Sequence, residues 1–78
     1  MSMVQVFGTT YRIHCVAPGT YDAVRLLDDV RMGSFSGGRP LQLDSPVGAD
    51  AGTESLLRQI AQTAIRMART HWATPSPH

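Results

Sequence analysis

The chain contains no lysine, one cysteine and one glutamate, and the shortages of cysteine and glutamate limit the chemistry that it can perform. A single cysteine, Cys15, cannot form an internal disulfide or a zinc site of the usual kind, so we expect a reducing, cytoplasmic setting. Five aspartates and one glutamate leave few pairs for general acid–base catalysis. No stretch approaches the ~18 apolar residues that a membrane helix needs. No basic region precedes an apolar run near the N-terminus, so no signal peptide and no membrane partner are expected.

What remains is a small and nearly neutral chain. It has 78 residues, of which 42% are hydrophobic, and its seven arginines against six acidic residues give a net charge of +1. This composition is typical of one globular domain. A chain of this length buries only ~60% of its extended surface, so large catalytic architectures such as barrels and doubly wound sheets are excluded.

Residues 3–36 alternate apolar and polar side chains with the two-residue period of half-buried strands. Turn signals at Gly8-Thr9, at Pro18-Gly19 and at a bulged three-residue loop over 27–29 separate the runs. Symmetric pairing about these turns predicts a four-stranded antiparallel meander in the order 1-2-3-4. The pairing sets Ile13 against Val24. The predicted buried face consists of Val4, Val6, Tyr11, Ile13, Cys15, Val24, Leu26, Val30 and Met32.

Residues 53–72 place their apolar side chains on one half of a helical wheel. We therefore expect one C-terminal amphipathic helix that packs on one face of the sheet, which makes the fold α+β. Thr53 is the predicted N-cap, and Glu54 complements the positive end of the helix dipole.

The domain organisation follows from these elements. Residues 1–72 are predicted to form a single βββ(β)α domain, and residues 73–78, with two prolines, a disordered tail. A long loop at 37–52 lies between sheet and helix. Residues 41–43 either form a short edge strand or belong to a mobile loop, and we expect an extended crossing there.

One helix covers one sheet face, so the other face is expected to be open. The predicted register sets three arginines opposite one another on that face, with an apolar and aromatic patch beside them. Arginine for phosphate next to aromatic rings for stacking is typical of nucleic-acid surfaces. We therefore hypothesise a non-enzymatic module that binds nucleic acid or another polyanion. The predicted binding residues are Arg12, His14, Arg25, Arg31, Tyr21 and Phe35.

Two other interpretations stay open. In the first, Asp22, Asp28 and Asp29 neutralise the arginines, which are then ordinary solvated residues. In the second, the open face binds a protein partner or a second copy, with Val16, Tyr21 and Phe35 as its apolar centre. The net charge of +1 argues against strong nonspecific DNA binding, which usually shows a larger basic excess.

The sequence offers weak catalytic candidates. His14 and Cys15 are adjacent on a strand, so they point to opposite faces and cannot form a nucleophile–base pair. Asp28 and Asp29 are explained by turn chemistry, and His71 lies near the end of the predicted helix. We expect no enzymatic activity, no metal site and no cofactor.

At the level of architecture, a meander packed on one C-terminal helix is similar to the sheet-reading DNA-binding domains. These include the plant ethylene-response type and the arm-binding domains of phage integrases. The resemblance implies that the open sheet face would lie in the major groove. Those domains have three strands where this chain is predicted to have four, and this sequence carries no diagnostic motif of either family. The likeness is therefore one of fold, and fold alone does not imply function.

Overall fold

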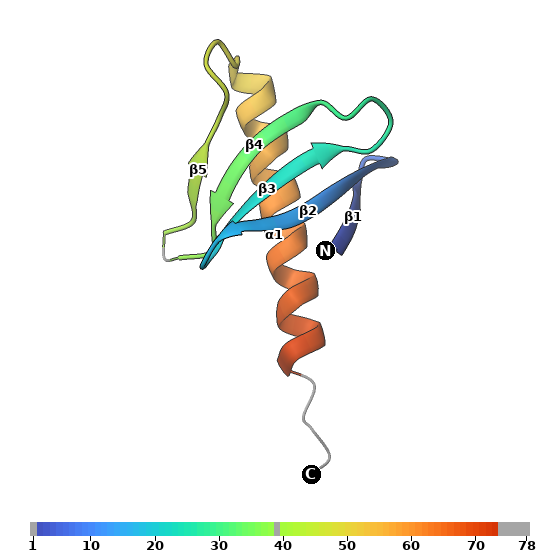
Figure 1. Ribbon diagram of the computed structural model, residues 1–78, viewed down its shortest axis with the longest axis vertical. Coiled ribbons are helices and arrows are strands. Elements are labelled where there is room, and N and C mark those ends of the chain that lie inside the picture. Colours follow the sequence, from blue (N-terminus) through green and yellow to red (C-terminus); the bar gives the residue numbers. More distant parts are fainter. Residues whose placement is uncertain (1, 39, 74–78) are drawn as a thin grey trace.

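The computed structural model describes residues 2–38 and 40–73, with side chains described as far as Ala68. Five strands precede a single helix, and the strands form one antiparallel sheet in the order β1-β2-β3-β4-β5 (Figure 1). The α+β meander is confirmed, with five strands instead of four. The elements are β1 (Ser2–Val6), β2 (Thr9–Ala17), β3 (Thr20–Arg25), β4 (Arg31–Ser36), β5 (Gln42–Asp44) and α1 (Ala51–Ala73).

The additional strand lies in the predicted long loop. β5 pairs with β4 so that Leu43 lies opposite Phe35. The structure therefore shows a short edge strand here, and the expectation of an extended crossing is wrong. Of the predicted tail over 73–78, Ala73 belongs to α1 and the remainder lies outside the described residues.

The first hairpin turns one residue earlier than predicted. Phe7 and Gly8 form the two-residue turn, both with positive φ (51° and 79°), as a type I′ hairpin requires. Val4 therefore lies opposite Tyr11 instead of Ile13. The register differs from the predicted one by two residues, and an even shift leaves every side chain on its face. Val4 and Val6 are accordingly buried, as expected.

The second hairpin departs from the prediction in a way that changes the faces of the sheet. Its turn at Pro18-Gly19 is confirmed, because Ala17 lies opposite Thr20. A bulge between Cys15 and Ala17 then slips the register by one residue, so that Ile13 lies opposite Ala23 instead of Val24. A one-residue slip moves each side chain of β3 to the other face.

The third hairpin contains a bulge, but it lies within the strands, between Ala23 and Val24 in the pairing of β3 with β4. The predicted three-residue loop over 27–29 is wrong, because the Arg25 backbone N–H donates a 2.8 Å hydrogen bond to the Val30 carbonyl and leaves residues 26–29 between them. Together the two bulges decide which apolar residues reach the helix. Phe35 and Ala23 are buried there, whereas three residues expected in the core are exposed. These incorrect assignments are Cys15, Leu26 (44% exposed) and Val30 (43% exposed).

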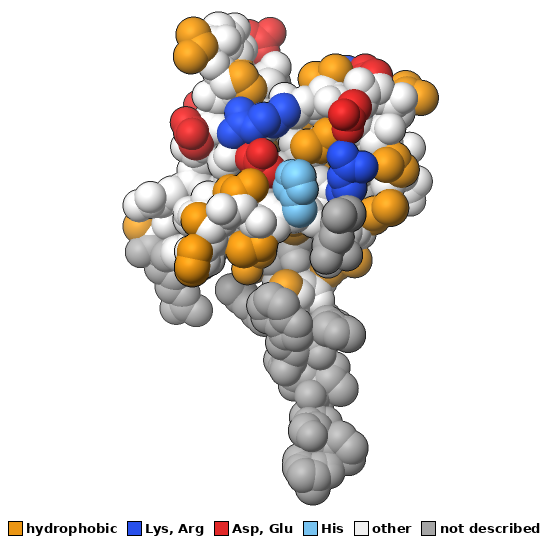
Figure 2. Space-filling view, in the orientation of Figure 1, with side chains coloured by type: hydrophobic (Ala, Val, Ile, Leu, Met, Phe, Trp, Pro, Cys, Tyr) orange, Lys and Arg blue, Asp and Glu red, His pale blue; other side chains and the backbone are white. Residues whose placement is uncertain are grey.

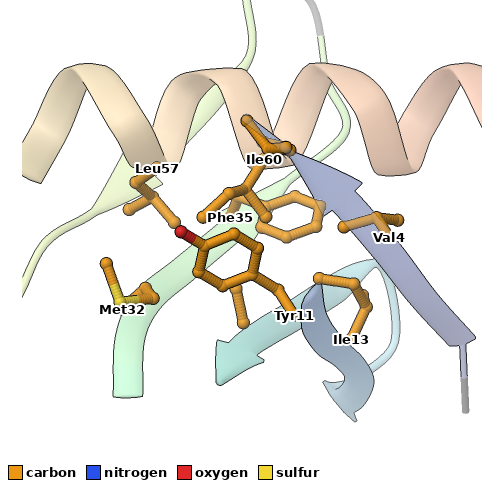
Figure 3. Packing of buried hydrophobic residues seen from close by; sticks show 10 residues of the cluster. Val4, Tyr11, Ile13, Met32, Phe35, Leu57 and Ile60 are labelled. Carbon is orange, nitrogen blue, oxygen red and sulfur yellow. The ribbon is translucent and has the colours of Figure 1, made fainter. Parts of the chain in front are cut away.

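The helix begins earlier than predicted because Asp50, not Thr53, caps it. The Asp50 Oδ1 accepts a hydrogen bond of 2.8 Å from the Thr53 backbone N–H. That bond is the main reason why the pKa of Asp50 lies below its usual value. The apolar stripe of α1 then packs on the sheet, where Leu57 and Ile60 are fully buried against Tyr11, Phe35 and other core residues (Figure 3).

Gly33 on β4 marks the point of closest approach between helix and sheet. Its φ is +142°, and a Cβ added there would lie 2.6 Å from the Leu57 Cδ2 and 2.8 Å from the Asp44 carbonyl oxygen. A real Cβ does not come this close to other atoms, so only glycine at position 33 allows the Leu57 side chain to contact the β4 backbone. Among the described residues, none belongs to a helix with the length and hydropathy of a membrane span.

Candidate functional site

Two surfaces could carry function, and the first is the open sheet face. Arg12 and Arg31 both lie on it, opposite Val24, which separates them and is only 7% exposed. Arg25 lies opposite Tyr11, on the helix side of the sheet, because of the bulge in the second hairpin. The predicted row of three adjacent arginines is therefore wrong.

All three arginines form ion pairs with aspartates. Arg12 lies 2.9 Å from Asp29, and Arg31 lies 3.1 Å from Asp22. The same pattern is visible in Figure 2, where basic and acidic side chains lie side by side on this face. These aspartates are among the three that the sequence offered as neutralising partners.

Arg25 forms the third pair. Its Nε and Nη2 each donate a 2.8 Å hydrogen bond to the Asp28 carboxylate. The hydrogen bond from Arg25 lowers the pKa of Asp28, and the same bond raises the pKa of Arg25. Each arginine therefore has an acidic neighbour that offsets its charge, which weakens its attraction for a phosphate.

Asp22 is the centre of a polar cluster on the open face. It accepts hydrogen bonds from the Arg31 Nε and from the Ser34 hydroxyl, which itself accepts a 2.6 Å bond from the Arg31 Nη2. Burial raises the pKa of Asp22, but the bonds from Arg31 and Ser34 outweigh that effect and hold it below the usual value.

His14 borders this cluster without completing a catalytic arrangement. Its Nε2 lies 3.9 Å from Asp22 Oδ2, and within the described part of the chain no hydrogen-bond partner is found for that nitrogen. A triad would need the hydroxyl to donate to the imidazole. Ser34 donates to the carboxylate instead, so this geometry provides no base for a serine nucleophile.

Asp22→Asn is expected to lower the free energy of unfolding by about 1–3 kcal/mol at neutral pH, because Arg31 loses its charged acceptor. Since the pKa of Asp22 is lowered on folding, its contribution is present above the unfolded value of 3.8 and lost as the pH falls through the lower folded value. Urea denaturation of both proteins should therefore show a difference that shrinks below about pH 4.

Asp44→Asn serves as the matched control, because Asp44 lies in the same row of the open face, opposite Ser34, and is exposed. It should change the unfolding free energy by less than about 0.5 kcal/mol. A penalty for Asp22→Asn that stays constant from pH 7 to about pH 3 would contradict the assignment.

The second surface is an apolar groove on the helix side. The C-terminal half of α1 extends past the end of the sheet (Figure 1). The groove, with a volume of about 970 Å³, lies between this half of the helix and the sheet. No charged side chain is among the described residues that line it. Met67 at the groove is 48% exposed. The larger side chains of its walls are Val4, Ile13, Tyr21, Phe35, Ile65 and Met67.

The two aromatic residues predicted for the open face belong to this groove. Tyr21 and Phe35 lie opposite each other on β3 and β4, with ring centroids 5.7 Å apart and ring planes inclined by 31°. Phe35 is 2% exposed and cannot stack on a nucleotide base. The prediction that these rings flank the arginines is therefore wrong, and Arg12, His14 and Arg31 are the site residues left on the open face.

Sequence reasoning missed the groove, although one signal was present. The helix predicted over residues 53–72 would extend over about 30 Å at 1.5 Å per residue. A six-residue strand such as β4 spans only about 20 Å. A helix longer than most of the strands it covers can leave part of its apolar stripe beyond the sheet.

Neither surface has the features of a metal site, since the described residues include no group of three or more His, Cys, Asp or Glu side chains placed to hold an ion. The architectural likeness to sheet-reading DNA-binding domains receives no support from known proteins either. Comparison finds no family model, no curated protein and no solved structure that matches the chain.

Proposed function

We propose that this chain is a non-enzymatic protein-interaction module that self-associates, with a second copy covering the apolar groove. The observation that carries the proposal is the groove itself, which is uncharged along its described lining and leaves Met67 half exposed. Contiguous exposed apolar surface on a small domain is typical of an interaction site. The groove also contains Tyr21 and Phe35, two of the three residues that the sequence suggested for an oligomer interface.

A second copy is the occupant that the groove favours. An uncharged groove accepts an uncharged surface, because a buried unpaired charge is costly. The C-terminal half of α1 presents such a surface as one wall of the groove, through Ala64, Met67 and Ala68. A two-fold axis would place this helix wall of each copy against the groove of the other, which gives a closed, isologous contact.

Binding of nucleic acid or another polyanion stays a prediction with weaker support. The arginines expected to bind phosphate are held by Asp22, Asp28 and Asp29. The aromatic residues expected beside them lie on the other face.

Met67→Arg is expected to weaken self-association by about 10-fold or more, because association would bury a charge without a partner. Sedimentation velocity over a series of protein concentrations measures the change. Gln62→Arg is the matched control, since it adds the same charge at another exposed position of α1. If the wild-type protein stays monomeric at a concentration of about 1 mM, its free energy of association is weaker than about 4 kcal/mol, and the proposed function is contradicted. Equal effects of the two substitutions would contradict the role of the groove.

A further inference from the structure

We propose that two copies of this chain join by antiparallel pairing of their β1 strands, so that one sheet runs through both. This proposal rests on the self-association proposed above and specifies its geometry. The argument depends on a difference between the two edges of the sheet, β1 and β5.

The β5 edge is protected against strand addition. β5 has three residues, carries Asp44 and lies between Pro40 and Pro46. Short length, charge and nearby proline are the devices by which natural proteins blunt a sheet edge.

The β1 edge has none of these devices. Its five residues, Ser2–Val6, include no charge and no proline, and their pairing with β2 contains no bulge. An edge strand of this kind is a template for another strand, because its outward N–H and C=O groups lack a sheet partner.

The hairpin geometry shows which groups point outward. In a two-residue hairpin the residues that flank the turn, here Val6 and Thr9, form a hydrogen-bonded pair. Hydrogen-bonded and non-hydrogen-bonded pairs alternate along an antiparallel ladder. The backbone groups of Met3 and Gln5 therefore point away from β2, toward the open edge.

Pairing of two β1 strands about a two-fold axis at Val4 uses these groups fully. Met3 then lies opposite Gln5 of the second copy and exchanges both backbone hydrogen bonds with it. Val4 lies opposite Val4 of the second copy, and no like charges meet. Since Val4 also lines the groove, this pairing joins the two grooves along one wall.

The same arrangement explains why association would stop at two copies. Once the β1 edges are paired, the edges that remain are the two β5 strands, which are protected. An isologous contact that leaves no open edge gives a closed dimer and not a fibre.

Gln5→Pro tests this geometry. Proline removes the outward N–H of Gln5, and a strand edge tolerates it because that group has no sheet partner among the described residues. We expect sedimentation velocity to show at least about 10-fold weaker dimerisation, and the far-ultraviolet circular dichroism to match the wild type. Gln5→Ser keeps the N–H and is the matched control, with dimerisation unchanged.

A cross-link provides a second, independent readout. Met3→Cys with Gln5→Cys, in a Cys15→Ser background, places cysteines opposite each other across the proposed two-fold axis, at the spacing that a disulfide allows. Mild oxidation should give a covalent dimer. Gln42→Cys in the same background, on the exposed β5 edge, should stay monomeric on a non-reducing gel.

The outcomes separate this inference from the proposed function. A monomeric wild-type protein overturns both. A wild-type dimer that persists in Gln5→Pro and gives no Met3–Gln5 cross-link overturns the β1 geometry and leaves groove-mediated self-association standing. If Gln5→Pro fails to fold, the cross-link decides between the two.

Discussion

Gly33→Ala is expected to lower the free energy of unfolding by about 2–6 kcal/mol. The added methyl would lie 2.6 Å from the Leu57 Cδ2 and 2.8 Å from the Asp44 carbonyl oxygen. Overpacking of this kind costs about 1–3 kcal/mol, and a φ of +142° adds backbone strain of about 1–3 kcal/mol for any residue with a Cβ. A 78-residue domain has a total stability of about 4–12 kcal/mol, so the substitution would remove a large share of it.

Urea denaturation followed by circular dichroism measures this loss. Gly48→Ala is the matched control, because Gly48 has a φ of +85° and a Cβ there would meet no atom within 4 Å. Gly48→Ala therefore reports backbone strain alone, about 1–3 kcal/mol. If the two substitutions lower the free energy of unfolding equally, the close contact between Leu57 and β4 does not contribute to the loss.

Leu57→Ala is expected to destabilise the domain by about 2–5 kcal/mol, because it removes a fully buried side chain from the centre of the core. The Leu57 side chain points from α1 toward the sheet (Figure 3), and its methyl carbons lie close to the Gly33 backbone of β4. Arg58→Ala, at the exposed position next to it, should change stability by less than about 0.5 kcal/mol.

Combining the two substitutions tests the contact itself. In the Gly33→Ala/Leu57→Ala protein, the new methyl on β4 enters space that the leucine has vacated. The loss should therefore be smaller than the sum of the single losses by about 0.5–3 kcal/mol, the usual size of coupling between touching residues. Strict additivity would show that the methyl at position 33 is limited by the Asp44 carbonyl or by backbone strain, and not by Leu57.

The periodicity of the sequence was enough to predict the type and order of the main elements. Alternation over residues 3–36 and the helical stripe over 53–72 correspond to β1–β4 and α1. Both patterns show which side chains face the core, because each residue of an element must point either toward the core or away from it. The β5 strand has only three residues, too few for a periodic pattern, so the sequence left it as one of two alternatives.

Register was less predictable, and its errors had unequal consequences. In the first hairpin a shift of two residues left Val4 and Val6 on the buried face. In the second hairpin a single bulged residue between Cys15 and Ala17 exchanged the faces of β3. Nothing in the local sequence distinguishes this bulge from regular pairing, because both keep the Pro18-Gly19 turn.

The benefit of the bulge lies in contacts distant in sequence. It places Tyr21 and Ala23 against the helix side and brings Asp22 to the open face, where it meets Arg31. These gains depend on α1 and β4, which follow later in the chain. A prediction made strand by strand cannot include them.

The sequence by itself determined the α+β class, the meander order and the amphipathic helix, because hydrophobic periodicity and turn chemistry are local properties. It also supplied the aspartates that pair with the arginines. Only the tertiary structure decided which face each side chain of β3 occupies, since a one-residue bulge is selected by packing against a distant helix. The same packing moved the aromatic residues from the predicted anion-binding face into an apolar groove, and so changed which surface is proposed to bind a partner.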